Sequence, residues 1–351
     1  MPADNDFSRV RKCLLLEGKP DRVPLCELHV DREVKEAFLG RPIASAQDEV
    51  DFWVAAGYDF VPLSAGLLEV GGVLSGEATR RKQHAYTAYG DGQREVTWAA
   101  EGEGVIVTRE QFEAFPWPCP DDPDLSHIEA VADLLPGNMR VIVIIGKVLT
   151  ATWMLMGWEG FGLASRYEPD LLADVFGRVA EVQFRTFERA LELPEVGALW
   201  MSDDMAYGTG LLCSPAILRE HVFPVYRRMG EICAERGVPF ALHSDGDLTP
   251  ILPDIVDCGF RALHPIEPQA MDALTVKAEW GDRLCLLGNI DVDLLARGTP
   301  EQVAEAVRRN IDLLGREGGY CVGSANSVTY YVPLRNFVTM IEMGLSYGKL
   351  V

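Results

Sequence analysis

The sequence lacks membrane-spanning runs, paired cysteines and nucleotide-binding motifs. No apolar run approaches the roughly 18 residues that cross a membrane. The eight cysteines include no C-x-x-C pair, so we expect reduced, buried thiols that behave as small apolar residues and no cysteine-rich structural zinc site. No G-x-G-x-x-G follows the first predicted strand and no phosphate-loop motif occurs, which argues against nucleotide-binding folds.

Basic residues are also scarce, because 32 Lys and Arg face 53 Asp and Glu and the net charge is −21. Phosphate neutralisation requires clustered Lys and Arg, so nucleic acid is excluded as a partner. The overall field disfavours a strongly anionic substrate unless a local basic pocket overrides it. Residues 1–7 lack the regions of a signal peptide. We therefore expect a cytoplasmic protein without membrane contact.

What the sequence does contain is a series of short apolar runs bounded by turn residues. Eight of them are predicted strands, at residues 23–30, 58–63, 140–146, 198–203, 239–243, 261–265, 283–288 and 320–324. Helices at this spacing between strands imply parallel pairing with right-handed crossovers. The predicted fold is therefore α/β: a single (β/α)8 TIM-type barrel domain over residues 1–351.

The predicted helices between the later strands have clear start signals. Ser214, Thr299 and Glu168 each precede a proline at the first helical position. Gln302 follows Thr299 by three residues and completes a capping box.

Residues 64–139 interrupt the alternation after the second predicted strand. Residues 85–98 are predicted to form two short antiparallel strands, and residues 104–108 a third. We interpret this segment as an antiparallel β insertion that covers the mouth of the barrel.

Polar residues follow several of the predicted strands, and such strand ends are typical of a barrel active site. In the clearest case, His243 and Asp245 alternate at the end of a strand, so both side chains can point to the barrel axis. They are candidate metal ligands, and His243 is also a candidate catalytic residue. Asp203 and Asp204 cannot both face inward, and Asp204 is the candidate catalytic residue of the two.

Further residues complete the predicted pocket. Glu267 lies in a stiff loop between two prolines and is a third candidate catalytic residue. His264 is interpreted as a strand-end histidine packed in the core, with metal ligation as the alternative. The candidate substrate-binding residues are Asn289, Asn326, Tyr207, Trp153, Glu159 and His29. Each of these side chains also has a structural interpretation, as a surface group, a helix cap or a core residue.

Ordered motifs between about Arg22 and the C-terminus carry a family resemblance. They are Asp203-Asp204, Ser214-Pro215, His243-Ser-Asp-Gly-Asp247, His264-Pro-Ile-Glu-Pro268, Gly288-Asn-Ile-Asp291 and Val332-Pro-Leu-Arg-Asn336. With these motifs the chain resembles the uroporphyrinogen decarboxylase superfamily. That superfamily includes the decarboxylase of haem synthesis and zinc methyltransferases that exchange methyl groups with corrinoid proteins. Dimers are common in it, so the resemblance allows a homodimer, although no feature of the sequence indicates an interface.

Two departures from the family patterns favour one branch. Where the decarboxylase carries arginines near its first strand, this sequence has Glu27, His29 and Asp31, which would repel a substrate with many carboxylates. The methyltransferases that act on thiols hold zinc with a His-x-Cys pair and a distant Cys. Here Asp245 and Asn326 stand at those cysteine positions, and oxygen donors make a harder, more Lewis-acidic site.

The resemblance therefore implies a methyltransferase of a corrinoid-dependent demethylation system. It would move a methyl group from a small, methoxylated aromatic substrate to a corrinoid carried on a partner protein. His243 and Asp245, with Glu267 or Asn326, would hold zinc or position a general acid. The alternatives are a cofactor-free decarboxylase of porphyrin biosynthesis and a barrel that binds its ligand without turnover.

Overall fold

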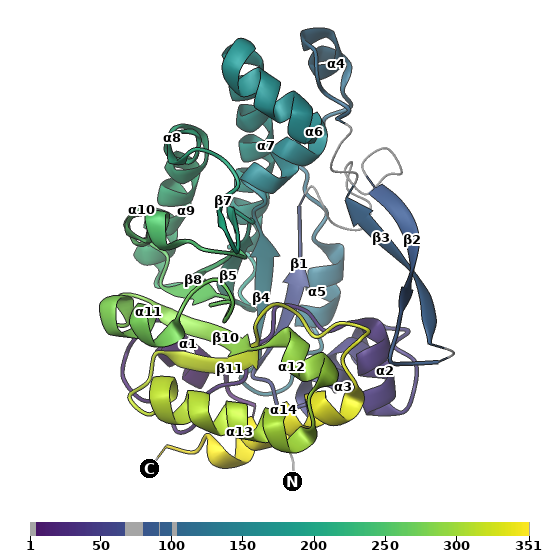
Figure 1. Ribbon diagram of the computed structural model, residues 1–351, viewed down its shortest axis with the longest axis vertical. Helices are drawn as coiled ribbons and strands as arrows, with labels where there is room; N and C mark the ends of the chain where they lie inside the picture. Colours follow the sequence, from purple (N-terminus) through teal and green to yellow (C-terminus); the bar gives the residue numbers. More distant parts are fainter. Residues whose placement is uncertain (1–4, 67–79, 91, 100–103, 351) are drawn as a thin grey trace.

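The computed structural model describes residues 5–66, 80–90, 92–99 and 104–350 (Figure 1). Its centre is a parallel sheet of seven strands in the order β1-β4-β5-β8-β9-β10-β11. The strands are β1 (Phe60–Ser64), β4 (Arg140–Ile145), β5 (Val196–Ser202), β8 (Phe240–His243), β9 (Ala262–His264), β10 (Cys285–Ile290) and β11 (Tyr320–Ser324). All neighbours are parallel and follow the chain order, so the predicted parallel α/β fold is confirmed.

The sheet curls so that strands from both of its edges line one interior. Alternate strand residues form a single buried cluster, which includes Phe60 of β1, Trp200 of β5 and Cys321 of β11. Leu28, from the segment before β1, belongs to the same cluster. Because β1 and β11 lie at opposite ends of the strand order, a shared interior requires the curvature of a barrel.

The first predicted strand, residues 23–30, is wrong as a regular strand. The segment lies parallel to β11 but makes only isolated bridges, one of them between Leu25 and Val322. Two features interrupt the ladder. Pro24 has no N–H to donate, and the Ser324 N–H donates to the Glu27 side chain at 2.7 Å. The eighth position of the barrel is therefore filled by an irregular segment.

Helix α1 (Phe7–Leu14) covers the end of the barrel at which the strands begin. Phe7 packs on Gly197 near the start of β5, where an added Cβ would lie 2.5 Å from the ring. At the start of β11, the Cys13 Sγ lies 3.1 Å from the Tyr320 carbonyl oxygen. Reactants must therefore enter from the opposite end, where the strands finish.

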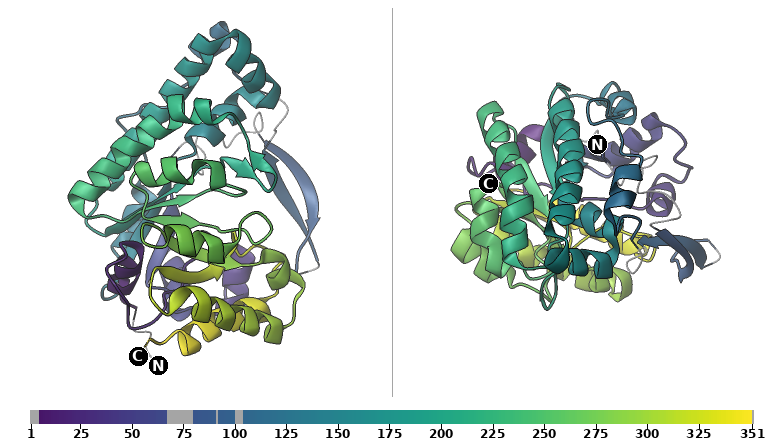
Figure 2. Two further views of the ribbon diagram at one scale, coloured as in Figure 1. Left: turned by 60° about the vertical axis from the view of Figure 1, so that its left-hand side comes forward. Right: turned by 90° about the horizontal axis from the view of Figure 1, so that it is seen from above.

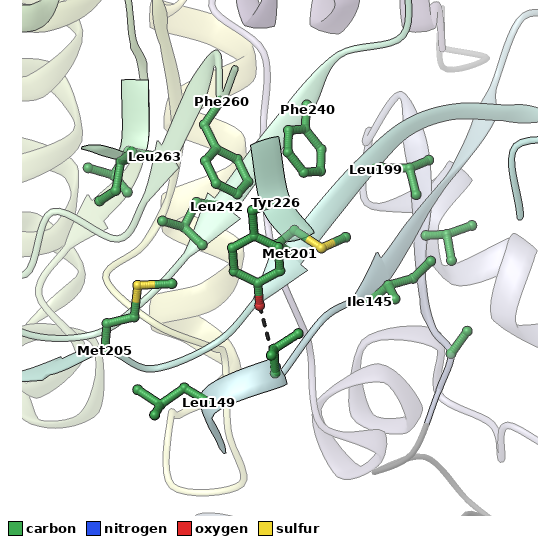
Figure 3. Close-up of a cluster of buried hydrophobic side chains, with 14 of the residues drawn as sticks. Ile145, Leu149, Leu199, Met201, Met205, Tyr226, Phe240, Leu242, Phe260 and Leu263 are labelled. Atoms are coloured by element: carbon green, nitrogen blue, oxygen red, sulfur yellow. Dashed lines mark hydrogen bonds between the residues drawn. The ribbon is translucent and has the colours of Figure 1, made fainter. Parts of the chain in front are cut away.

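Most of the other helices surround the sheet (Figures 1 and 2). They are α2 (Arg32–Leu39), α3 (Ala46–Ala55), α5 (Ser126–Ala132), α6 (Val148–Tyr167), α7 (Pro169–Ala190), α9 (Phe223–Arg236), α10 (Leu252–Asp257), α11 (Ala273–Trp280), α12 (Val292–Arg297), α13 (Pro300–Asn310) and α14 (Leu334–Tyr347). Figure 3 shows Met201 and Leu242 of the sheet beside Leu149 of α6 and Tyr226 of α9. Among the described residues, no helix has the length and apolarity needed to span a bilayer.

The predicted helix starts are largely confirmed. Thr299 and Gln302 form the reciprocal hydrogen bonds of a capping box at the start of α13. Ser214 accepts a hydrogen bond from the Ala216 N–H, but the helix that it caps, α8 (Pro215–Ile217), runs directly into a π-helical turn before α9. Helix α7 begins at Pro169 as predicted, although Glu168 provides no side-chain cap.

The insertion contains an antiparallel ribbon of β2 (Arg80–Tyr86) and β3 (Gln93–Ala99). Its residues 67–79, 91 and 100–103 lie outside the described part of the chain. The ribbon stands beside the barrel (Figure 1), and the Tyr89 hydroxyl donates to the Val332 carbonyl oxygen at 2.8 Å. That this insertion covers the barrel mouth stays a prediction.

The predicted strand at residues 104–108 is wrong. The N–H groups of Val105 and Ile106 both donate to the Leu155 carbonyl oxygen of α6, at 2.7 and 2.9 Å. That oxygen is free because α6 is interrupted at Gly157, which has a φ of 67°. The segment therefore packs on a broken helix, and α4 (Arg109–Ala114) follows it.

Candidate active site

His243 is the buried centre of a polar cluster at the C-terminal ends of the strands. It follows Leu242 at the end of β8 and, like Ala241, faces the barrel interior. Its Nε2 lies 3.5 Å from Oδ1 of Asp204 and 3.8 Å from Oδ1 of Asp245. These three side chains offer ligand atoms within 4.8 Å of one another, which is the spacing of donors around one metal ion.

The loops after four strands hold this cluster in place. Asn326, after β11, donates from Nδ2 to both carboxylate oxygens of Asp245, at 2.8 and 3.0 Å. Asp204, after β5, accepts from the Asp245 N–H at 3.2 Å. Glu267, after β9, accepts from the Gly246 N–H at 2.7 Å. The structure thus brings together five of the residues that the sequence singled out.

Gly246 is required by the close approach of two loops. Its φ is 86°, and an added Cβ would lie 2.5 Å from the Tyr207 carbonyl oxygen. Only glycine satisfies both constraints. Its N–H is thereby free to hold Glu267 beside the His243 cluster.

The electrostatics of the cluster favour a bound cation. Burial lowers the pKa of His243 to about 4, so its imidazole is neutral at pH 7. Burial, reinforced by the negative charges of Asp204 and Glu267, raises the pKa of Asp245 to about 8. A cation among these groups would replace the proton on Asp245 and offset the repulsion between the carboxylates.

Comparison with known proteins assigns the chain to a family. The family model described as uroporphyrinogen decarboxylase (URO-D) matches residues 105–346, more than half of the chain. The chain belongs to the uroporphyrinogen decarboxylase family.

Two relatives of this family member are methyltransferases. The chain is 27% identical over 301 residues to the methylcobamide:CoM methyltransferase MtaA of Methanosarcina barkeri, covering 80% of the chain and 82% of the relative. It also resembles a solved methyltransferase from Methanosarcina mazei, with a TM-score of 0.69 at 19% identity over 97% of this chain and 98% of that one. The structural likeness supports the barrel fold. As its curated relative indicates, this member of the uroporphyrinogen decarboxylase family is an enzyme of the methyltransferase class.

In this family member His264 is a direct hydrogen-bond partner of His243, whereas the sequence predicted a histidine packed in the core. His243 and His264 are direct partners in the register of β8 and β9. Their Nδ1 atoms lie 2.7 Å apart, so one ring donates a proton and the other accepts it. The signal in the sequence was that two neighbouring strands both end on histidine.

The tautomer of His264 decides what His243 can do. The Nε2 of His243 keeps a lone pair beside Asp204 and Asp245 only if its own Nδ1–H donates to His264. His264 must then carry its proton on Nε2, which is buried beside the backbone of Ser324. Burial lowers the pKa of His264 well below its usual value, while the backbone of Ser324 acts in the opposite direction.

Asp203 faces away from this pair and supports the scaffold. Its carboxylate accepts hydrogen bonds from the Leu149 N–H at 2.9 Å, the Thr150 N–H at 2.8 Å and the Tyr226 hydroxyl at 2.7 Å. It therefore holds the first turn of α6 against α9 and β5. The side chains of Asp203 and Asp204 therefore point to opposite sides of the strand end, as predicted from the alternation of side chains along a strand.

We expect the Asp203→Asn variant to lose stability, because one of the two buried N–H groups then faces an amide NH2 and has no acceptor. An unsatisfied buried donor costs about 1–3 kcal/mol, and this should appear as a lower free energy of unfolding in urea. Asp282→Asn is the matched control, since the Asp282 side chain is 77% exposed and lies outside the site, so that free energy should be nearly unchanged. Equal losses in the two variants would contradict the scaffold role.

The other predicted site residues lie apart from the His243 cluster or at its edge. Asn289, with a φ of 71°, bonds to Asn310 of α13 at 2.9 Å and so turns toward the helical layer. His29 is exposed, and its Nε2 lies 3.1 Å from Asp31. Tyr207 is 56% exposed, beside the Gly246 loop. Trp153 and Glu159 both lie on α6, where Trp153 is buried and Glu159 is exposed.

Proposed function

We propose that the protein is the substrate-demethylating methyltransferase of a corrinoid-dependent system. It would take a methyl group from a small methoxylated aromatic compound and pass it to a corrinoid on a partner protein. The observation that carries the proposal is the His243, Asp204 and Asp245 cluster at the mouth of a barrel whose relatives are methyltransferases. A neutral imidazole and two carboxylates are the donors of a hard, Lewis-acidic metal site.

His243, Asp204 and Asp245 would hold a divalent cation, and zinc is the candidate. The neutral imidazole and the short spacing of the three donors fit such an ion. Asn326 fixes the orientation of Asp245, and His264 fixes that of His243, which are the supporting contacts that metal sites use. When bound, the ion supplies a Lewis acid that stabilises negative charge on the oxygen that loses its methyl group.

The proposed reaction cleaves the O–CH3 bond of the substrate. The bonding electrons stay on the oxygen, and the methyl group passes to cobalt(I) of the corrinoid, whose electron pair forms the new C–Co bond. We assign Glu267 to fix the Gly246 loop beside the cluster, because its Oε2 accepts from the Gly246 N–H at 2.7 Å, and the departing phenolate takes its proton from solvent.

Aromatic side chains of α6 support an aromatic substrate. Trp153 and Trp158 stack with their ring centroids 4.6 Å apart, and the buried Trp153 Nε1 has no hydrogen-bond partner among the described residues. Trp153 lies one turn along α6 from Thr150, whose Oγ1 accepts from the Asp204 N–H at 3.3 Å. We therefore place the substrate ring between the tryptophan pair and the cluster, with exposed Glu159 further along the helix.

The competing function is the decarboxylation that names the family. Against it stands the charge of the site, because Asp204, Asp245 and Glu267 would repel a substrate with many carboxylates. Besides burial, the negative charges of Asp204 and Glu267 also contribute to the raised pKa of Asp245.

The decisive experiment incubates the purified protein with methoxylated aromatic compounds and a cobalt(I) corrinoid protein. We expect equal amounts of methyl-cobalt(III), followed by absorbance, and of the demethylated phenol. Elemental analysis should show that the wild-type protein holds one equivalent of metal more than His243→Ala. Release of carbon dioxide from uroporphyrinogen without methyl transfer would overturn the proposal in favour of the decarboxylase. Methyl transfer from methyl-corrinoid to a thiol alone would overturn the assigned donor.

Substitution of His264 tests how His243 is oriented. His264→Leu removes the acceptor of the His243 Nδ1–H, so we expect metal affinity to fall by about 10- to 100-fold. His264→Asn places an amide oxygen near the lost Nδ1 and should recover part of the affinity. Chelator competition measures both dissociation constants. Wild-type affinity in His264→Leu would show that His264 only fills space.

A further inference from the structure

Three cysteines that are distant in the sequence meet inside the barrel, at the end opposite to the His243 cluster. Cys13 comes from α1, Cys285 begins β10 and Cys321 is the second residue of β11. All three are fully buried, and their sulfur atoms lie within 4.8 Å of one another. The Sγ atoms of Cys13 and Cys285 are 3.8 Å apart. The spacing of cysteines along the chain gave no sign of this group.

The 3.8 Å distance between the sulfur atoms of Cys13 and Cys285 is that expected between two thiolate ligands of one metal ion. A zinc–sulfur bond of about 2.3 Å places two tetrahedral thiolate ligands about 3.8 Å apart. A disulfide would need the sulfurs to approach to about 2 Å and would leave the third thiol over. The observed arrangement is therefore closer to that of three ligands than to that of a bonded pair.

Packing alone does not require three thiols at this point. Cys285 pairs in register with Ala262 of β9, and Ala262 pairs with Ala241 of β8. All three positions face the barrel interior, so alanine is sufficient to fill this layer on the neighbouring strands. The sulfur atoms face α1, which contributes a thiol of its own.

We propose that Cys13, Cys285 and Cys321 bind one soft d10 cation, Zn²⁺ or Cu⁺. Thiolates are the ligands that select these ions. Three thiolates suffice for Cu⁺, whereas Cys26, which is buried in the same cluster but outside the group of three, would have to move closer to act as the fourth ligand of zinc. The site is separate from the His243 cluster and does not depend on the proposed function.

A cation is already present beside this site to compensate its charge. Lys277 of α11 donates from Nζ to the carbonyl oxygens of Gly318 and Gly319 at 2.8 and 2.9 Å, just before β11. Burial raises the pKa of the Cys285 thiol well above its usual value, and the positive charge of Lys277 acts in the opposite direction. A metal bound here would tie α1 to β10 and β11, across 272 residues between Cys13 and Cys285.

The test uses Cd²⁺ as the probe in the full-length His243→Ala variant, which lacks the other candidate site. Because the thiols are buried, the protein is unfolded under reducing conditions and refolded with Cd²⁺. We expect one equivalent of bound Cd²⁺, a near-ultraviolet sulfur-to-cadmium absorption band, and a melting temperature a few degrees above that of the metal-free protein. A parallel refolding with Zn²⁺ or Cu⁺, followed by elemental analysis, distinguishes the two ions.

Cysteine substitutions assign the band to these residues. Cys13→Ser, Cys285→Ser and Cys321→Ser should each remove most of it. Cys233→Ser is the matched control, because Cys233 is also buried but lies on α9 in a different cluster, and it should keep the full band. No band in the refolded His243→Ala protein, or a band unchanged in the three serine variants, would overturn the proposal. Demethylation by the wild-type protein would be unaffected by that result.

Discussion

Replacing His243 with alanine is expected to reduce methyl transfer by about 100- to 1,000-fold, the usual effect of removing one group that stabilises charge in a transition state. The variant loses the only nitrogen donor of the cluster and leaves Asp204 and Asp245 without the buried imidazole between them. The readout is kcat for corrinoid methylation, together with metal content. The kcat and the metal content should fall together, because Nε2 of His243 would bind the metal ion on which methyl transfer depends.

Two controls separate this loss from misfolding. His84→Asn changes an exposed histidine on β2 and should leave kcat unchanged. Asp245→Asn keeps an oxygen near the cation but removes a charge, so its metal affinity should lie between those of the wild type and His243→Ala. A folded His243→Ala protein with wild-type kcat would remove the basis of the proposed function.

Substituting Glu27 with glutamine is expected to make the protein more stable at alkaline pH and to flatten its stability profile. Burial raises the pKa of Glu27 from 4.5 to about 8, against the opposing hydrogen bonds from Ser324. In the unfolded chain the group ionises near 4.5. Between these two values the folded state holds a proton that the unfolded state has released. The stabilisation is therefore complete below pH 4.5 and is lost as the pH rises to about 8.

The size of this effect follows from about 1.4 kcal/mol for each pH unit, which sets an upper bound of about 5 kcal/mol. Glutamine is neutral at every pH and keeps an acceptor for the Ser324 N–H and a donor for the Ser324 Oγ. Urea unfolding from pH 5 to 9 should show a steep fall for the wild type and a shallower one for Glu27→Gln. Glu305→Gln, on the exposed face of α13, should follow the wild type. Parallel curves for wild type and Glu27→Gln would exclude a buried, protonated Glu27.

The parts of the site that could be predicted are those set by strand periodicity. The position of His243 at the end of β8 fixes its direction, and the same two-residue period brings Asp245 to the cluster. The gathering of loops from four strands follows from parallel order alone. Ring-to-ring contact between His243 and His264 depends instead on the register of β8 against β9, which one sequence does not reveal.

The predictions that were wrong share a cause. Backbone hydrogen bonds that a regular strand would make are taken by side chains and carbonyl groups whose positions the hydrophobic pattern does not indicate. Glu27 takes the N–H that would extend the ladder between residues 23–30 and β11. A carbonyl oxygen freed by the break at Gly157 captures the segment predicted as a strand at 104–108. Asn289 was expected in the pocket, but its positive φ turns it out of the strand alternation.

Helix α1 precedes every strand of the sheet in the chain, yet part of its packing surface is covered by segments that come much later. Its Cys13 meets Tyr320, which lies 307 residues further along the chain. Until the final strands have been synthesised, the apolar face of this helix is only partly covered, and contacts of such long separation form slowly. Part of this surface therefore stays exposed for much of synthesis, and transiently exposed apolar surface favours association between unfinished chains.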